Sequence, residues 1–400
     1  MKSRYPIAPN LSGAYAAHKL IAAGKSVAVL DARRRIGGRL LTAEKQSGCL
    51  GGAWIWPRSE YVMQQFLTEL DVKTVPMHMG GETMARTPDG KRHVLPSGEA
   101  ARYAACGGGA VRVSGGAASM VQKLLRDDGN RNPNLSIQLG MQVDRIEHGD
   151  DGVKIIGSKA ETNQKNEEFS IKCRTAILAA PPKVLSQTIQ FNPLLPKQKM
   201  DSMIATPTWM EDYGKVLVSF SDNWWRRLNM SAVSIDQIGA VSTWWEAASG
   251  IDGDGMPALA GFVTANGANT LQEIEDGEAM HDYIIDSLEN LYGVNGAKMG
   301  VQKDSSGITI DGSANSDGLV VSKGNVTITY KSWSGDPYTN ANLNDSEQHS
   351  FTTDYGDRDL QQSVGSLFFA GTETAHGSGH MEGAIISGQR AADEVIEYLS

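Results

Sequence analysis

Glycines, one acid and several arginines follow a short apolar segment near the start of the chain. Asp31 ends that segment, and the run 31–39 reads D-A-R-R-R-I-G-G-R. An acid at the end of a strand can hold ribose hydroxyl groups, and glycines let the backbone approach a pyrophosphate. The guanidinium groups of Arg33 and Arg39 offer planar donors to phosphate oxygens. These residue types predict a dinucleotide site; a solvated basic loop is the alternative.

The segment before this run carries only part of a glycine-rich phosphate motif. When residues 8–13 are aligned with Gly-x-Gly-x-x-Gly, only the third glycine, Gly13, is in place, next to Ser12. Asp31 follows Gly13 at a distance of 18 residues, near the separation expected for a ribose-binding acid. Asn10 stands where the second glycine is expected and tolerates a positive φ better than most residues. We expect the two missing glycines to weaken pyrophosphate binding.

A second strand and glycine turn lie near the end of the chain. The apolar segment 367–370 precedes Gly371, Glu373 and a helix predicted from Gly383 to Leu399. A tight turn of this kind aims the positive end of the helix dipole at a ligand, where it can stabilise negative charge on a bound cofactor. The glycines between the two histidines of this region break helical spacing, so no metal site is predicted. The alternative is a strand and a helix that merely pack.

Together these motifs resemble those of the flavin-containing amine oxidase family. The run 31–39 resembles the family's acid-Ala-Arg-x-Arg-x-Gly-Gly-Arg signature, and 367–384 nearly spells its terminal motif. Similar segments follow in the family's order: 51–54, 112–116, Val143 and 176–182. The resemblance implies FAD as the cofactor, bound by Ser12, Gly13, Asp31, Ala32, Arg33, Gly38, Arg39, Gly52, Ala53, Trp54, Val143, Gly371, Glu373 and Met381. Glu373 would accept a hydrogen bond from a ribityl hydroxyl group.

Three further residues match positions that carry the chemistry in this family. Lys215 resembles the lysine that holds a water molecule against flavin N5; a lysine at the surface edge of a strand is the alternative. Trp333 resembles the aromatic residue that flanks the flavin ring, with a core tryptophan as the alternative. His380 and Leu343 stand where the monoamine oxidases have an aromatic pair around the amine. The usual monoamine substrates are therefore not implied.

The resemblance implies an oxidase that converts an amine to an imine, and then to an aldehyde, while O2 is reduced to H2O2. No side-chain base is required, because positioning and desolvation of a neutral amine carry much of the work. Asn342 replaces the cysteine that attaches flavin covalently, so the FAD should be non-covalent. Two alternatives stay open. One is a related flavin oxidase acting on an amino acid, tetrapyrrole or carotenoid-type substrate, and the other is a catalytically impaired member with weakened FAD binding.

The elements that must position these residues fall into a recognisable order. Small and apolar residues at helical spacing predict a helix at 12–23 capped by Ser12, followed by a buried parallel strand at 27–31. Helix and strand together indicate a βαβ unit. Three segments between 142 and 172 predict an antiparallel meander that leads back into the parallel sheet at 176–179. A second amphipathic helix is predicted at 278–292.

We therefore expect an α/β fold with two domains. A Rossmann-like FAD-binding domain, with a doubly wound parallel sheet and a β-meander, would comprise residues 1–58, 112–182 and 361–400. An α+β substrate domain with a mixed or antiparallel sheet would comprise 59–111 and 183–360. A chain of 400 residues exceeds the size at which single cores usually stop growing, which agrees with this division.

Charge and composition limit the class of protein further. The formal net charge of -9 argues against a nucleic-acid partner. The three cysteines, Cys49, Cys106 and Cys173, lie far apart, which indicates neither disulfides nor a zinc site. No apolar run suggests a transmembrane segment or a secretory signal, so the cytoplasm is the default location. The partners expected are a small-molecule amine and O2, and the sequence does not indicate an oligomeric state.

Overall fold

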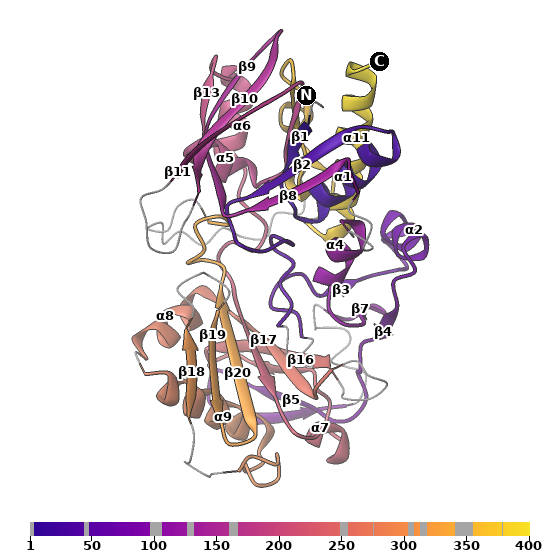
Figure 1. Ribbon diagram of the computed structural model, residues 1–400. Helices are drawn as coiled ribbons and strands as arrows, with labels where there is room; N and C mark the ends of the chain where they lie inside the picture. The colour runs from indigo at the N-terminus through magenta and orange to yellow at the C-terminus, as the bar shows by residue number, and fades with distance from the viewer. Residues whose placement is uncertain are drawn as a thin grey trace.

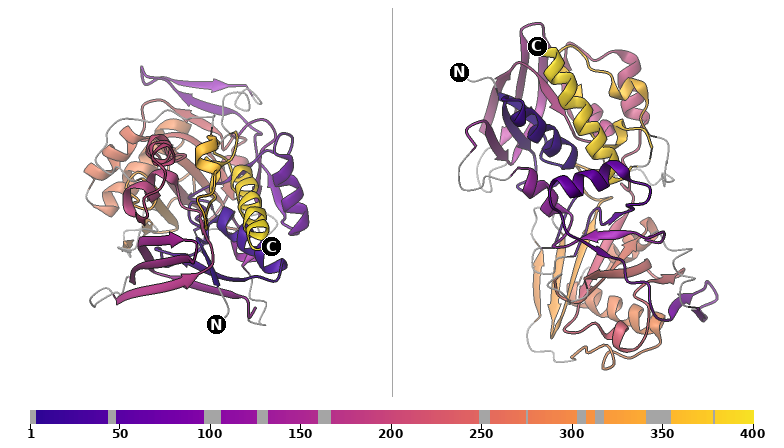
Figure 2. Two further views of the ribbon diagram at one scale, coloured as in Figure 1. Left: turned by 90° about the horizontal axis from the view of Figure 1, so that it is seen from above. Right: turned by 90° about the vertical axis from the view of Figure 1, so that its right-hand side faces the viewer.

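The computed structural model describes residues 4–43, 48–96, 106–125, 132–159, 167–248, 255–274, 276–302, 308–312, 318–340, 355–377 and 379–400. They form two lobes, an upper lobe that contains the carboxyl terminus and a lower lobe built on a large sheet (Figure 1). The side view shows the same two lobes, with strands of the lower lobe reaching toward the upper one (Figure 2).

Parallel strands form the centre of the upper lobe, as a three-stranded sheet with a two-stranded sheet beside it. The strands are β1 (Arg4–Ile7), β2 (Ser26–Asp31), β8 (Leu135–Leu139), β12 (Ala176–Leu178) and β21 (Leu367–Phe369). β2 pairs in parallel with β1 and β8, β12 pairs in parallel with β21, and β12 lies beside β1. Helices α1 (Leu11–Ala22) and α11 (Met381–Tyr398) pack closely together on this sheet. The α/β fold class and the βαβ unit predicted from the sequence are confirmed.

The cap of α1 differs from the prediction. Asn10, and not Ser12, is the N-cap residue, because its Oδ1 accepts a hydrogen bond from the Gly13 amide at 3.0 Å. Ser12 lies inside the helix, and its hydroxyl donates to the same Oδ1 at 2.9 Å. Asparagine and serine are both strong N-cap residues, and the predicted cap at Ser12 is wrong by two positions.

The predicted meander is present and extends further along the chain than expected. It consists of β9 (Met141–Gly149), β10 (Gly152–Lys159) and β11 (Glu167–Cys173), and β13 (Gln190–Asn192) pairs in parallel with β9. α5 (Pro182–Thr188) and α6 (Lys197–Ala205) accompany it in the upper lobe (Figure 1), and α10 (Arg358–Gln361) packs against α6. Since β13 joins the meander and α5 packs against α6, the residues from Pro182 to Ala205 lie with the upper lobe, beyond the boundary predicted at residue 182.

A small three-stranded sheet connects the two lobes. β7 (Val111–Val113) pairs with β3 (Trp54–Ile55) and β4 (Thr74–Pro76), and the helices beside it are α2 (Tyr61–Glu69) and α4 (Ala118–Leu124). α2 packs against α11 and α4 packs against α1. Residues 61–76 therefore belong with the upper lobe, although the sequence assigned 59–111 to the other domain.

A nine-stranded, mainly antiparallel sheet forms the lower lobe. Its order is β18-β19-β20-β14-β17-β16-β15-β5-β6. The bounds are β5 (Thr83–Arg86), β6 (Arg92–Leu95), β14 (Gly214–Ser219), β15 (Ser234–Asp236), β16 (Val241–Ala248), β17 (Ala258–Val263), β18 (Thr309–Gly312), β19 (Leu319–Lys323) and β20 (Val326–Ser332). Helices α7 (Trp224–Arg227), α8 (Ala265–Glu273) and α9 (Gly277–Tyr292) pack with it around buried tryptophans. The mixed sheet predicted for the second domain is confirmed.

Candidate active site

One cavity of about 770 Å³ runs from the ends of the parallel strands to the upper end of β14. Cofactor and ligand sites in proteins usually have volumes of about 300–1,000 Å³. Most of the residues predicted to act there line it: Ser12, Asp31, Ala32, Arg33, Gly38, Arg39, Gly52, Ala53, Trp54, Val143, Lys215, Trp333, Gly371, His380 and Met381. Gly13 and Glu373 are buried behind the wall. We call the part near α1 the dinucleotide end and the part near Lys215 the amine end.

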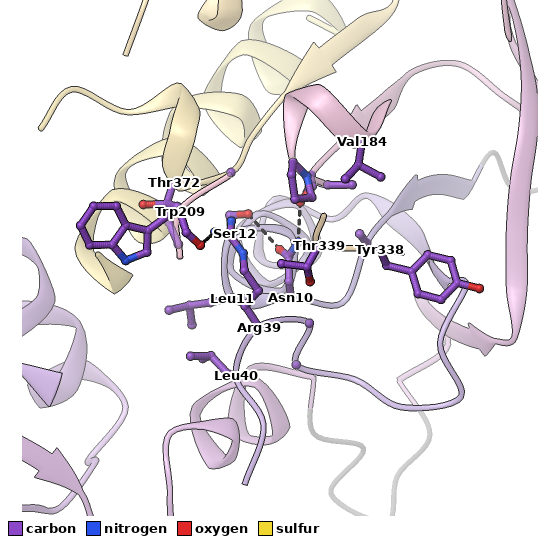
Figure 3. A pocket seen from close by; sticks show the side chains of 18 of the residues that line it. Asn10, Leu11, Ser12, Arg39, Leu40, Val184, Trp209, Tyr338, Thr339 and Thr372 are labelled. Carbon is purple, nitrogen blue, oxygen red and sulfur yellow. Dashed lines mark hydrogen bonds between the residues drawn. The ribbon is translucent and has the colours of Figure 1, made fainter. Parts of the chain in front are cut away.

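The dinucleotide end lies beyond the carboxyl ends of β1 and β12. Open α/β sheets bind ligands at such a point, beyond the carboxyl ends of the strands. Asn10 spans this opening, since its Nδ2 donates to the Ala179 carbonyl after β12 while its Oδ1 caps α1. Figure 3 shows its side chain between α1 and the segment that carries Val184. The first amides of α1, which would otherwise face a phosphate, are thus partly occupied by the protein itself.

The predicted phosphate-binding arginine, Arg33, already has partners. Its Nη2 lies 2.7 Å from Asp336 Oδ1 and 3.2 Å from Thr339 Oγ1, and its guanidinium carbon is 5.0 Å from the centre of the Tyr338 ring. Its Nε is buried and has no hydrogen-bond partner within the described part of the chain. One buried donor of Arg33 is therefore left for an acceptor in the cavity.

The predicted ribose-binding acid, Asp31, is also engaged within the protein. Its Oδ1 accepts a hydrogen bond of 2.7 Å from the Arg33 amide. Burial raises the pKa of Asp31, and the nearby Arg33 acts in the opposite direction. Its side chain still lines the cavity beside Ala32, as the prediction required.

Arg39 and Glu373 form a two-point ion pair across the cavity wall. The distances from the two Arg39 nitrogens to the carboxylate are 2.7 and 2.9 Å. Glu373 belongs to the 3-10 turn η1 (Thr372–Thr374), is fully buried, and also accepts from the Trp209 amide at 3.1 Å. The predicted ribityl partner is thus held by Arg39 and Trp209, and the neighbouring Thr372 is the η1 residue that lines the cavity.

Two glycines allow the backbone turns that form this wall of the cavity. Gly38 has φ +58°, and a Cβ on it would lie 2.7 Å from the Asn10 Cβ. Gly371 has φ +127°, which L side chains rarely adopt, and it turns the chain from β21 into η1. The two predicted glycine turns therefore shape the dinucleotide end.

Lys215 is the single lysine predicted to act, and the structure places it at the amine end. It lies on β14, an inner strand, with 5% of its surface exposed, so the surface-edge alternative is wrong. Its Nζ donates to the Gly51 carbonyl at 2.5 Å and lies 5.1 Å from the ring centres of Trp245 and Phe262. Burial lowers the pKa of Lys215 to about 8. This amine is held rigidly in an aromatic pocket.

Trp333 lies close to Lys215 along the same wall. Its indole Nε1 donates to the Leu50 carbonyl at 2.8 Å, and only 5% of its surface is exposed. It belongs to the core and lines the cavity at the same time. Trp333 is therefore a core tryptophan that also reaches the cavity, and its place beside the flavin ring stays a prediction.

His380 is held by three residues that the sequence did not single out. Its Nδ1 lies 2.8 Å from Glu60 Oε1. Its ring stacks on Trp56 at 4.7 Å and 21°, and meets the edge of Trp209 at 5.7 Å and 70°. Glu60 and His380 are 320 positions apart, so no local pattern could have joined them.

Comparisons with known proteins place the chain in a family. A family model described as flavin containing amine oxidoreductase matches residues 11–102 and 98–396. The chain belongs to this family. Flavin containing amine oxidoreductases use a flavin, so the membership implies FAD as the cofactor of this chain.

Relatives within the flavin containing amine oxidoreductases match with modest identity. Flavin-containing amine oxidase B of Bos taurus is 28% identical over 225 residues, which cover 56% of this chain and 38% of that protein. Putrescine oxidase of Kocuria rosea is 38% identical over 95 residues, or 22% of this chain and 20% of that protein. The matches span 38% to 51% of the length of the first four curated relatives.

Solved structures share the fold over the whole chain. Cyclohexylamine oxidase from Brevibacterium oxydans IH-35A has a TM-score of 0.70 at 18% identity, covering all of both chains. A putrescine oxidase bound to putrescine has a TM-score of 0.67 at 18% identity, covering 99% of both chains. Within the described residues, no helix is both long and apolar enough to cross a membrane.

The cavity fits FAD in most respects and departs in one. Its volume, the glycine turns and the unpaired Arg33 Nε suit a dinucleotide. The departure is Asn10, whose side chain occupies the start of α1 where a glycine would leave space for the pyrophosphate. Asn342 and Leu343, which the sequence linked to flavin attachment and to the amine site, lie outside the described residues.

Proposed function

We propose that this protein is an FAD-dependent oxidase of a small amine, forming an imine that hydrolyses to an aldehyde while O2 is reduced to H2O2. The FAD is non-covalent in this proposal. The observation that carries it is the meeting of Lys215, Trp333 and His380, from three distant segments, in the cavity that also contains the dinucleotide motif. These three residues are the proposed active-site residues.

Lys215, Trp333 and the dinucleotide motif each have a part that their surroundings support. Bound FAD would supply the chemistry by accepting a hydride equivalent from the amine and passing two electrons to O2. Lys215, fixed on the Gly51 carbonyl, holds a water molecule at the amine end. Trp333 and the rings around Lys215 exclude bulk water, which keeps the amine neutral and in position. Arg33 and the glycine turns bind the pyrophosphate and its sugars.

The experiment uses the purified full chain reconstituted with excess FAD. We expect a yellow protein whose flavin absorption band bleaches when an amine is added without oxygen and returns with release of H2O2 when air is admitted. A screen of monoamines, polyamines and amino acids then defines the substrate class. Bleaching by amino acids alone would favour the related oxidase weighed above. A reconstituted flavoprotein that no amine reduces would overturn the proposal.

A second candidate function is favoured by Asn10 alone. If its cap on α1 cannot be displaced, the protein is a family member that binds FAD weakly and turns over slowly. Titration of the apoprotein with FAD, followed by gel filtration to remove the unbound cofactor, separates the two candidates, because only the impaired member loses its flavin and emerges colourless.

A further inference from the structure

The amine end of the cavity contains an acid and a histidine in direct contact, which the proposed mechanism leaves unused. His380 lines the cavity with 30% of its side chain exposed, whereas the Glu60 side chain is only 7% exposed. Within the described residues, the Nε2 atom of His380 makes no hydrogen bond, and Glu60 binds only the other ring nitrogen. One nitrogen of the ring is therefore fixed and the other is available.

Glu60 is held so that it specifies which nitrogen carries the proton. Its Oε2 accepts a hydrogen bond of 2.9 Å from the Trp56 amide, and its Oε1 lies 2.8 Å from His380 Nδ1. A carboxylate can only accept, so the neutral imidazole must carry its proton on Nδ1. Nε2 then carries a lone pair, on a side chain that lines the cavity.

The aromatic residues around His380 fix the plane of its ring. Trp56 lies against one face, and its own indole donates to the Gly107 carbonyl at 3.0 Å. Trp209 meets the ring from another side, and Gly379 is required there because a Cβ would lie 2.4 Å from the Trp209 ring. A ring fixed in plane and tautomer is the arrangement that general bases need.

We propose that His380 is the base that takes a proton from the substrate ammonium ion as it enters, and that Glu60 is its positioning residue. This inference rests on the proposed amine oxidase function. The N–H bond of the ammonium breaks and its electron pair stays on nitrogen, while a new N–H bond forms at Nε2. Glu60 stabilises the resulting imidazolium, which returns the proton to water through its exposed edge.

The proposal explains how a charged amine becomes oxidisable in this cavity. Alkyl amines have a pKa of about 10 and enter as cations at neutral pH. Hydride removal requires the neutral amine, so a proton acceptor at the amine end adds to the rate. The other charged groups on the segments packed around the ring include Glu382 on α11, which accepts from the Val62 amide, and the Arg39–Glu373 pair. Glu211 lies 3.7 Å from Lys183, and Arg58 is exposed.

The decisive variant is Glu60→Gln, which keeps the size of the side chain. If the Gln oxygen faces the Trp56 amide, its NH2 group faces His380 Nδ1, and the imidazole proton must move to Nε2. In the reverse orientation the Gln NH2 group would face the Trp56 N–H, and two donors cannot form a hydrogen bond. His380→Phe is the second variant, because it keeps a flat ring on Trp56 and removes both nitrogens. Glu382→Gln is the matched control: Glu382 accepts from the Val62 amide at 2.8 Å, which an amide oxygen can also do.

The measurement is anaerobic flavin reduction at pH 7 with two amines. One is an ordinary alkyl amine, and the other is a β-trifluorinated analogue, which is largely neutral at this pH. We expect Glu60→Gln and His380→Phe to lose about 10²-fold in the rate with the alkyl amine and to stay near wild type with the fluorinated one. Glu382→Gln should match wild type with both.

The possible outcomes distinguish a failure of the role proposed for His380 from a failure of the proposed oxidase function. A variant that merely disturbs the site loses rate equally with the two amines, and this would overturn the role of His380 as a base. Unchanged rates with both amines would overturn it as well. If wild-type protein with bound FAD is reduced by neither amine, nor by any amine of the wider screen, the proposed function itself fails.

Discussion

The two ends of the cavity differ in how their polar groups are satisfied. At the dinucleotide end, Arg33 is paired with Asp336, Arg39 with Glu373, and the start of α1 with Asn10. At the amine end, Lys215 donates to a carbonyl and has no carboxylate partner within the described part of the chain, and His380 keeps one nitrogen for the cavity. The protein has thus preorganised the end where chemistry is proposed, whereas the end that recognises the cofactor must exchange partners to bind it.

The largest effect at the dinucleotide end is expected when the Asp336 carboxylate, which holds Arg33, loses its charge. The Asp336 side chain is fully buried and contacts Arg33 at 2.7 Å and Lys331 at 2.8 Å. We expect Asp336→Asn to lower the free energy of unfolding of the apoprotein by about 3–5 kcal/mol, because two buried cations lose their anion. Chemical denaturation measures this change. Asp201→Asn, which breaks an exposed pair with Lys197, should cost no more than about 1 kcal/mol.

The same variant has a pH dependence that follows from its pKa. Burial acts to raise the pKa of Asp336, but Arg33 and Lys331 hold it below its usual value of 3.8. A depressed pKa gives stability that is present above the unfolded value and is lost as the pH falls through the folded value. The stability gap between wild type and Asp336→Asn should therefore shrink below about pH 4. A gap that stays constant down to acid unfolding would contradict this account of the pair.

Lys215 tests the amine end, where a lysine is buried and, among the residues that the structure describes, bonds to a carbonyl oxygen and to no carboxylate. Burial lowers the pKa of Lys215 to about 8 from a usual value of 10.5. Between these values the unfolded chain binds more protons than the folded one, so stability rises with pH. Relative to Lys215→Met, wild-type apoprotein should gain about 3 kcal/mol in unfolding free energy from pH 8 to pH 10.5. Denaturation across this range measures it, and Lys197→Met, at an exposed lysine, should show no such gain.

The sequence predicted those parts of the site whose geometry depends on residues that are neighbours in the chain. The run from Asp31 to Arg39 and the turn at Gly371 combine a strand end, glycines and charged groups within a few positions, so their geometry is local. Lys215 was placed only by resemblance, because its burial depends on the strands that flank β14. The partners that complete the site are distant: Asp336 lies 303 positions from Arg33 and Glu60 lies 320 from His380. Such pairs arise from packing of the two lobes and the connecting sheet.

A related physical reason applies to the boundary that the sequence predicted at residue 182. Pro181 and Pro182 end a strand, as predicted, but the chain after them forms α5 and β13 and returns to the meander. Proline marks the end of an element and does not show which sheet the next element joins. Pairing of β13 with β9 is a tertiary choice, made by residues about 45 positions apart.

Substitution of Asn10 is expected to give the smallest effect, and it tests whether the dinucleotide end must exchange hydrogen-bond partners to bind FAD. To bind a pyrophosphate at α1, its side chain must give up the hydrogen bonds to Gly13 and Ala179, each worth about 1 kcal/mol net. In Asn10→Gly no such exchange is needed, so we expect FAD to bind about tenfold more tightly, a gain of about 1.4 kcal/mol. The cap itself is lost, but glycine replaces a capping side chain at a cost of only a few tenths of a kcal/mol in stability.

Two measurements on the apoprotein decide this prediction without turnover. Quenching of FAD fluorescence gives the dissociation constant, and thermal unfolding gives the change in stability. Thr264→Gly is the matched control, because Thr264 caps α8 through the amide three positions on, as Asn10 caps α1, and does not line the cavity. It should lower stability slightly and leave FAD affinity unchanged. Equal or weaker FAD binding by Asn10→Gly would mean that the Asn10 side chain contributes to the cofactor site, and the dinucleotide end would then be preorganised as well.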